Sequence, residues 1–329
     1  MQTDAYVVDI AADGTLTQGF QSITLPALGP NEVRLKTVAS SVNYKDFLAT
    51  QAQTGVVRHY PIVPGIDVVG EVIATTTADF TIGELVVVTG YGLGTQHDGG
   101  FATYVQVPAA WVVKLPRELT PQTAMQFGTA GVTAAAAILK LQAQGMTVAD
   151  QPRIVVSGAT GGVGSLAIAF LQASGYQNIT ALVRHHRLDD TLKQLGATTI
   201  RLVDDVLAQP AKPLLSQQYD YALDTVGAEL SAYLLAMLQA NGAMAMTGNV
   251  AGNQLPTTVL PFILRGITVI GIDSVNLTPT FREQIWQRLA SDWQVDLGHL
   301  LTQIPFEELP TVLDAFANQQ HHGRTVITF

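Results

Sequence analysis

The first third of the chain shows short apolar runs separated by turn residues. Runs rich in β-branched residues begin at 5, 32, 67, 84 and 101 ("AYVVDI", "EVRLKTVAS", "DVVGEVIAT", "ELVVVTGYG" and "FATYVQV"), and Gly, Pro, Asn and Asp lie between them. This spacing is typical of a barrel or a sandwich of short strands, and it differs from the spacing of strand–helix–strand units.

The pattern becomes helical between 121 and 145, where an Ala-rich run follows Pro121 and stops at Gly145. From 151 onwards, short apolar runs alternate with helical ones. Strands are predicted at 152–159, 179–183, 219–227, 243–248 and 266–275, and helices at 161–175, 188–197 and 230–242. Such alternation predicts a parallel, doubly wound sheet. In the tail, the patterns predict helices around 280–292 and 309–320 and a closing strand at 324–329.

Composition supports a two-domain globular protein. The chain has 329 residues, of which 47% are hydrophobic and 13% charged, and no apolar run is long enough to cross a membrane. It has no cysteine, which excludes disulfides and Cys-ligated zinc or iron–sulfur sites. The absence of cysteine and of a signal-peptide pattern fits a cytoplasmic protein. The net charge of −9 argues against nucleic-acid binding.

The stretch "VVSGATGGVGS" (155–165) follows a predicted strand and opens a predicted helix, which is the setting of a dinucleotide-binding loop. Gly161 would let the backbone approach a pyrophosphate, and Gly164 would let the helix pack closely on the strand. Ala159 stands at the first glycine position of the usual pattern. The alternative is a glycine-rich turn that binds no ligand.

Four consecutive basic residues, Arg184 to Arg187, follow the second strand of the doubly wound region. Dinucleotide folds that prefer NAD carry an acidic residue at this point, about 20 residues past the glycine loop, where it binds the ribose 2′-hydroxyl. Here Val183 and Arg184 occupy the position, and a guanidinium suits a 2′-phosphate instead. We therefore expect Arg184, helped by His185 or Arg187, to select NADPH. The alternatives are a solvated basic loop and, less favoured, a metal site.

Several strings carry a resemblance to a known family. They are "SSVNYKDFLA" (40–49), "VRHYPIVPGIDVVGEV" (57–72), "GTAGVTAA" (128–135), "DTVG" (224–227), "LPTTVLPFILRG" (255–266) and "GIDSVNLTP" (271–279). Over its whole length the chain resembles the medium-chain dehydrogenase/reductase superfamily. Within that superfamily it is similar to the zinc-free, NADPH-dependent YhdH/YhfP-type quinone oxidoreductases, whose best-defined members are acrylyl-CoA reductases.

The resemblance implies an α/β fold with a GroES-like β-barrel domain and a Rossmann domain. The expected boundaries are 1–123 for the GroES-like catalytic domain, 124–275 for the NADP-binding domain, and 276–329 for a C-terminal segment that returns to the catalytic domain. The zinc branch uses a Cys and a G-H-E histidine as catalytic ligands, whereas this chain has Ile66 and Asp67 there. We expect no metal, and a hydrogen-bonding, structural role for Asp67.

The resemblance also implies which residues contact the cofactor. Tyr44 and Asn43, in "VNYKD", are expected beside the nicotinamide as catalytic residues, where a phenol could donate a hydrogen bond or a proton. The alternative for Tyr44 is simple packing on the nicotinamide. Lys45 and Asp46 are expected to pair with each other or with the domain. The expected cofactor set is Tyr44, Thr160, Gly161, Gly162, Val163, Val183, Arg184, His185, Arg201, Asn249, Ile263, Ser274 and Asn318. Core packing is the alternative for Ile263.

The expected reaction is hydride transfer from NADPH to the β-carbon of an enoyl thioester such as acryloyl-CoA, followed by protonation of the α-carbon by Tyr44 or water. Cationic candidates for the CoA tail are Arg58, His59, Arg265 and Arg282, and His97 lies in a Gly-flanked loop. One alternative is an NADPH:quinone oxidoreductase, and another is a non-catalytic NADPH-binding protein. The hydrophobic strand 266–275 predicts a homodimer, because a long exposed strand edge invites pairing.

Overall fold

The structure is a computed structural model that describes residues 1–52 and 54–329, and its backbone divides into two compact units. Unit 1 comprises 1–129, 275–290 and 301–329, and unit 2 comprises 130–274 and 291–300. The resemblance implies boundaries after 123 and 275; in the structure the first unit extends to Thr129, and ten residues of the tail belong to unit 2.

Unit 1 is built mainly of strands, as the short apolar runs predict. Its elements are β1 (Gln2–Ile10), β2 (Leu16–Thr24), β3 (Glu32–Val42), α1 (Tyr44–Ala49), β4 (Asp67–Thr75), β5 (Leu85–Thr89), β6 (Tyr104–Pro108), η1 (Ala109–Trp111), β7 (Val113–Lys114), α8 (Pro279–Leu289), β14 (Leu301–Pro305), η4 (Phe306–Glu308), α9 (Leu309–Ala317) and β15 (Arg324–Thr328).

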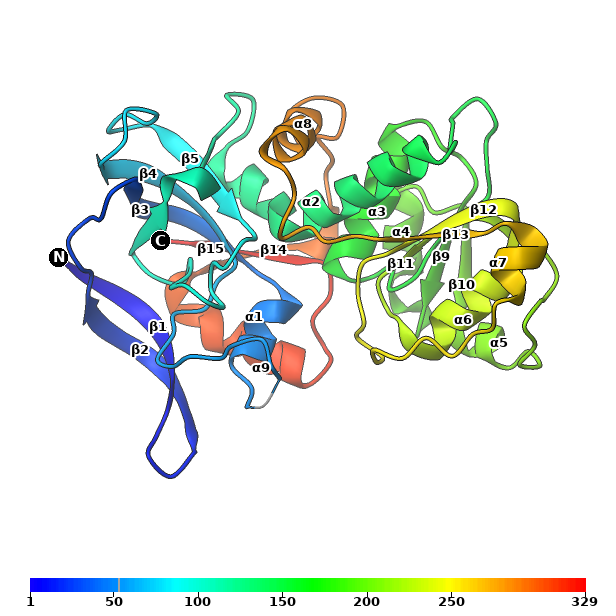
Figure 1. The fold of residues 1–329 in the computed structure, drawn as a ribbon, viewed down its shortest axis with the longest axis horizontal. Coiled ribbons are helices and arrows are strands. Elements are labelled where there is room, and N and C mark those ends of the chain that lie inside the picture. Colours follow the sequence, from blue (N-terminus) through cyan, green and yellow to red (C-terminus); the bar gives the residue numbers. More distant parts are fainter. Residues whose placement is uncertain (53) are drawn as a thin grey trace. The chain divides into compact units, whose positions relative to one another are not determined.

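Seven of these strands form one sheet in the order β14-β15-β3-β4-β5-β7, with β6 also paired to β3, and β1 and β2 form a separate hairpin. The red C-terminal strand β15 lies antiparallel beside the blue strand β3, with Thr325 opposite Val42 (Figure 1). Alternate side chains of the strands, among them Val8, Leu35, Val68 and Val86, are buried in one core cluster. This β-rich architecture agrees with the GroES-like β domain that the resemblance implies.

Helix α2 (Pro121–Ala143) follows the strands of the first domain. Its backbone is non-helical at Gly128, where φ is 50° and ψ is −153°. Among the described residues, α2 is the one helix long and apolar enough to cross a membrane, but 83% of its most apolar window is buried inside the protein. Burial to this degree is typical of the core helix of a folded domain.

Unit 2 is a doubly wound α/β domain. It contains the part of α2 from Ala130 onwards. The elements that follow are β8 (Ile154–Val156), α3 (Gly162–Ala173), β9 (Ile179–Val183), η2 (His186–Leu188), α4 (Asp189–Gln194), β10 (Thr199–Leu202), α5 (Val203–Leu207), β11 (Tyr219–Asp224), α6 (Ala228–Met237), β12 (Leu238–Met246), α7 (Leu260–Arg265), β13 (Thr268–Gly271) and η3 (Gly298–Leu300). Six parallel strands run in the order β10-β9-β8-β11-β12-β13. The predicted Rossmann sheet is confirmed.

The sequence patterns missed several short elements. Strands β10 and β14 have four and five residues and half-exposed faces, so they carry no continuous apolar run. Helices α5 and α7, of five and six residues, are too short to show a period. The helix predicted at 230–242 ends at Met237, and β12 starts directly after it.

Candidate cofactor and active site

The carboxyl ends of the parallel strands gather the candidate cofactor residues of unit 2. The loop before α3 follows β8, the basic stretch follows β9, and Asn249 and Ser274 lie three residues beyond β12 and β13. Strand β8 has β9 on one side and β11 on the other, so the direction of winding reverses at β8. Ligands of open α/β sheets bind at this edge and at this reversal.

The glycine loop between β8 and α3 has the form of an anion cradle. Gly161 is the N-cap of α3, and as a glycine it has no side chain to cap the free N–H groups of the first helical turn. A Cβ on Gly164 would lie 2.3 Å from the carbonyl oxygen of Gly158, so the close packing expected of Gly164 is confirmed. Uncapped N–H groups at the start of a twelve-residue helix fit a dinucleotide pyrophosphate. Thr160, Gly161, Gly162 and Val163 are half-buried there.

The adenosine end of the site lies after β9. Val183 is buried, whereas Arg184, His185 and Arg187 are exposed. His186 accepts or donates a 2.8 Å hydrogen bond at Nδ1 with Asp189, at the start of α4. The guanidinium of Arg184, directly after the end of β9, suits a phosphate ester.

Arg201 lies on the neighbouring strand β10, where Leu202 pairs with Val183. Its Nη1 donates to the side chains of Gln218 at 2.5 Å and Tyr219 at 2.7 Å. One end of this guanidinium is therefore used within unit 2, and only the rest of it is available to help Arg184.

The remaining cofactor candidates have different environments. Asn249 is exposed, and the half-buried Ser274 hydroxyl lies 2.7 Å from that of Thr133. Ile263 is 70% exposed on α7, so the core-packing interpretation is wrong for this residue. Asn318, in unit 1, is exposed at the C-cap of α9.

In unit 1, polar side chains meet where three neighbouring strands begin or end. Ser41 lies near the end of β3, Asp67 opens β4, and Arg324 opens β15. The registers that pair Ser40 with Val68 and Thr325 with Val42 bring these strand ends together, and Asn43 follows directly after β3. We call Ser41, Asn43, Asp67 and Arg324 the buried polar network.

Asp67 is wholly buried and accepts hydrogen bonds at both carboxylate oxygens. The donors are the Ser41 hydroxyl at 2.6 Å, the Asn43 amide at 2.8 Å, and the backbone N–H and hydroxyl of Thr129 at 2.9 and 2.5 Å. The structural role expected of Asp67 is confirmed. A Cβ on Gly128 would lie 2.4 Å from Asp67 Oδ2, so the break in α2 leaves room for this carboxylate.

Arg324 is the cation of the network and is 2% exposed. It donates to the carbonyl oxygens of Gln126 and Val42, to Asn43 Oδ1 at 3.0 Å and to Ser41 Oγ at 2.8 Å. Burial lowers the pKa of its guanidinium, while Asp67 and Asp46 oppose that shift. Sequence reasoning missed Arg324; its one signal was a charged residue at the start of an otherwise apolar closing strand.

Asn43 is held at both ends of its side chain, by Asp67 and by Arg324. Its backbone N–H donates to Asp46 Oδ2 at 2.8 Å, which completes a capping box at the start of α1. Asp46 also accepts from the N–H groups of Gly65 and Ile66, so its expected pairing with the domain is confirmed. Burial and the nearby Asp67 raise the pKa of Asp46 to about 7, against the lowering effect of these hydrogen bonds.

Tyr44, the first residue of α1, is 40% exposed. Its ring packs against Phe47 and Phe316, whose ring centroids are 5.8 and 6.3 Å away. The His321 ring stacks on that of Phe316, with a distance of 3.9 Å between ring centroids. Burial lowers the pKa of His321 to about 4, and Arg324 and His322 add to the shift. Tyr44 is therefore supported by a neutral aromatic cluster.

Two of the four candidates for a CoA tail serve the fold instead. Arg282 is 1% exposed and donates to the carbonyl oxygens of Thr89 and Val275, and Arg265 donates to three carbonyl oxygens of unit 2. Arg58 and His59 are exposed. His97 packs edge-on against Trp111 and contacts the Asp98 carbonyl oxygen at 2.9 Å.

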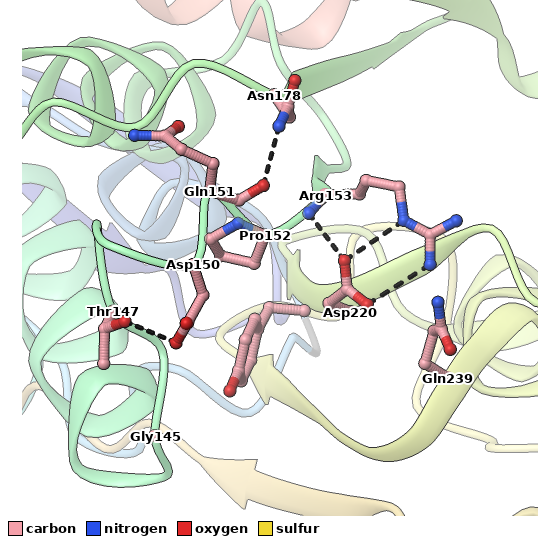
Figure 2. Close-up of a pocket in the computed structure, with 10 residues that line it drawn as sticks. Gly145, Thr147, Asp150, Gln151, Pro152, Arg153, Asn178, Asp220 and Gln239 are labelled. Carbon is pink, nitrogen blue, oxygen red and sulfur yellow. Dashed lines mark hydrogen bonds and ion pairs between the residues drawn. The ribbon is translucent and has the colours of Figure 1, made fainter.

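A surface pocket of about 520 Å³ lies at the opposite edge of the unit 2 sheet (Figure 2). Its lining comes from residues before or near the amino ends of β8, β9, β11 and β12, and the Arg153 guanidinium binds both carboxylate oxygens of Asp220 within it. None of the expected cofactor residues lines this pocket. Since ligands of such sheets bind at the carboxyl edge, the pocket is not the candidate active site.

Comparison with known proteins agrees with this geometry. The family described as "Alcohol dehydrogenase GroES-like domain" matches residues 29–117, and "Zinc-binding dehydrogenase" matches 162–291. A Bacillus subtilis protein with the name "Putative quinone oxidoreductase YhfP" is 38% identical over 93% of both chains. Acrylyl-CoA reductase AcuI of Ruegeria pomeroyi is 36% identical over 98% of both chains.

Solved structures give the same result. The Salmonella enterica yhdH oxidoreductase in complex with NADP matches all of both chains at 36% identity and a TM-score of 0.93. The YhfP structure, with NAD bound, matches at a TM-score of 0.94. These matches define an oxidoreductase of the medium-chain dehydrogenase/reductase superfamily. Within that superfamily, the chain belongs to the YhdH/YhfP/AcuI acrylyl-CoA reductase group.

Proposed function

We propose that this protein is a zinc-independent, NADPH-dependent reductase of an activated carbon–carbon double bond, with acryloyl-CoA or a related 2-enoyl thioester as substrate. The observation that carries the proposal is near full-length similarity to a protein named acrylyl-CoA reductase. The chain has no cysteine, and Asp67 stands where the zinc branch has its histidine, so polarisation of an alcohol by a Cys-ligated zinc does not apply.

The cofactor side of the proposal rests on the carboxyl edge of the unit 2 sheet. Thr160, Gly161, Gly162 and Val163 would hold the pyrophosphate, and Val183, Arg184, His185 and Arg201 the adenosine 2′-phosphate. Asn249, Ile263, Ser274 and Asn318 would contact the rest of the dinucleotide. When bound, NADPH supplies the hydride that the substrate β-carbon accepts.

On the substrate side, we propose that Tyr44 contacts the cofactor and donates the proton that the substrate α-carbon receives. The half-exposed phenol at the start of α1 is accessible for this task. Asn43 has both ends of its amide occupied, so its proposed part is to hold α1, and with it Tyr44, in position. The resemblance implies that Asn43 is a catalytic residue beside the nicotinamide. We propose a positioning role instead, because both ends of its amide are already hydrogen-bonded within the protein.

The alternative is reduction of a quinone at the same site, which the name of the relative YhfP favours. Turnover of acryloyl-CoA and of a benzoquinone, measured side by side with NADPH, separates the two. We expect kcat/KM to be higher for acryloyl-CoA. Reduction of quinones with no turnover of acryloyl-CoA would overturn the proposal. No reduction of either, with NADPH still bound, would favour the third candidate, a non-catalytic NADPH-binding protein.

We further propose that the protein is a cytoplasmic homodimer. Strand β13 is the last strand at its side of the unit 2 sheet, and Val259 and Leu264, on the segment of chain that precedes it, are 64% and 62% exposed. An apolar edge of this kind is protected when it pairs with a second copy. Light scattering at micromolar concentration should give the mass of a dimer, and a monomer there would contradict this proposal.

A further inference from the structure

Three loops at the carboxyl edge of the unit 2 sheet meet at one buried residue, Asp224, the last residue of β11. Its carboxylate accepts hydrogen bonds from the hydroxyls of Ser157, at 2.5 Å, and Ser231, and from the N–H groups of Val226 and Gly227 at 3.1 and 3.2 Å. Its backbone carbonyl accepts from the N–H and hydroxyl of Thr247 at 2.8 and 3.1 Å.

The charge of Asp224 is balanced by dipoles. Its side chain is 0% exposed, and within residues 1–52 and 54–329 no ion pair involves it. Two hydroxyls, two N–H groups and the start of the ten-residue helix α6 supply the stabilisation. An asparagine would turn one acceptor into a donor and would oppose the groups that now donate to it.

The glycine loop takes its shape from this centre. Ser157 directly precedes the loop, and its hydroxyl also accepts the N–H of Thr225 at 2.9 Å, while its carbonyl accepts the Thr225 hydroxyl at 3.0 Å. Gly158 has φ of +58°, and a Cβ there would lie 2.2 Å from the Thr225 hydroxyl. The start of the cradle is therefore held against the turn at 224–227.

The segment that carries Asn249 is held by the same turn. Thr247 bonds to the Asp224 carbonyl, and the N–H of Ala251 donates to the Val226 carbonyl at 2.9 Å. Asn249 lies between these two attachments. The proposed pyrophosphate loop and the proposed nicotinamide-ribose segment are thus joined through residues 224–227.

We infer that Asp224 is a positioning residue for the dinucleotide: through Ser157 and Thr247 it holds the two cofactor-binding loops in one arrangement. The inference rests on the proposed placement of NADPH at this edge. Because Asp224 is fully buried, it would act through these loops and not by direct contact with a ligand.

Two serine variants separate positioning from simple stabilisation. Ser157 and Ser231 are both fully buried and both donate to the same carboxylate, but only Ser157 adjoins the glycine loop. For the full chain, we would measure the dissociation constant of NADPH by quenching of protein fluorescence, and the melting temperature of each variant. Thr225→Ala, which removes the hydroxyl bonded to the Ser157 carbonyl, serves as a second loop variant if Ser157→Ala does not fold.

We expect Ser157→Ala, or Thr225→Ala, to raise the dissociation constant of NADPH on the order of tenfold. Ser231→Ala should lower the melting temperature about as much as Ser157→Ala does. It should leave the dissociation constant of NADPH within about twofold of the wild-type value. Equal effects of the loop and helix variants on NADPH binding would overturn the inference. A wild-type protein that does not bind NADPH would instead refute the proposed function.

Discussion

Arg324 and Asp67 lie 3.9 Å apart, from guanidinium Nη2 to carboxylate Oδ2, and the Ser41 hydroxyl bridges them inside unit 1. The side chains are 2% and 0% exposed. A buried cation therefore lies beside the position that the zinc branch uses for a metal ligand, and its charge is met by Asp67 and by backbone carbonyls. We therefore expect the buried polar network to contribute to the free energy of unfolding.

Replacement of Arg324 by lysine should lower the free energy of unfolding by about 3 kcal/mol or more, because an ammonium group cannot serve all the acceptors around this buried pair. Urea unfolding of the full chain measures this loss. Arg153→Lys is the matched control, since the Arg153–Asp220 pair is partly exposed and should cost about 1 kcal/mol or less. Similar losses in both variants would show that the buried network contributes little.

Arg184 should set the preference for NADPH over NADH. Arg184→Ala should weaken NADPH binding about tenfold or more and leave NADH binding nearly unchanged, because the lost bond is to a charged phosphate. Titration with both cofactors measures the ratio. His186→Ala is the control, since His186 is engaged by Asp189, and it should leave the ratio unaltered. An unaltered ratio in Arg184→Ala would mean that the basic stretch is a solvated loop.

Asp46 should make stability depend on pH. Its pKa of about 7 in the folded protein lies above its ordinary value of 3.8. Between pH 3.8 and about 7, the folded state keeps a proton on Asp46 that the unfolded state releases. The contribution of Asp46 to the free energy of unfolding is therefore complete below pH 3.8 and is lost as the pH rises to about 7. Asp46→Asn should abolish that decline in unfolding free energy, measured by urea titration across this range. A decline that persists in the variant would contradict the assignment.

His321 should act in the opposite direction over the same range. Its pKa is lowered from 6.5 to about 4, so the unfolded state binds a proton that the folded state refuses, and stability falls as pH falls from 6.5 to about 4. In the wild-type protein the two effects partly cancel. His321→Phe, which retains an aromatic ring against Phe316, should therefore make the decline caused by Asp46 steeper.

Tyr44→Phe tests the proton donor. The variant keeps the ring that packs on Phe47 and Phe316 and removes only the hydroxyl, so the dissociation constant of NADPH should change little. If Tyr44 donates the proton, kcat should fall about a hundredfold. Phe47→Leu is the control for loosened packing. A kcat equal to that of the wild type would assign the proton to water and leave Tyr44 with packing alone.

The sequence predicts the layout of unit 2 better than the centre of unit 1. Apolar runs at 154–156, 179–183 and 219–224 mark parallel strands, and the residues that follow them must share one edge, so the position of the loops proposed to bind the cofactor could be predicted. The buried polar network could not. The bond from Arg324 to Ser41 spans 283 positions, and nothing local to either residue announces it.

Other failures also have physical reasons. Arg265 and Arg282 looked available for an anionic ligand, because sequence alone does not show which backbone carbonyls are left for a guanidinium to satisfy. For Ile263, only the alternative of core packing fails, because α7 has just six residues and leaves this side chain exposed. In each case, the type of residue does not determine the role of the side chain, and the tertiary contacts do.

The central claim, hydride transfer to an enoyl thioester, is tested most directly with NADPH deuterated at the nicotinamide C4. Acryloyl-CoA and the full chain are incubated with the two C4-deuterated epimers in turn, and the thioester product is analysed by mass spectrometry and NMR. We predict that one epimer delivers a single deuterium to the β-carbon of propionyl-CoA. Absence of propionyl-CoA, or a product with no deuterium at the β-carbon from either epimer, would contradict the account.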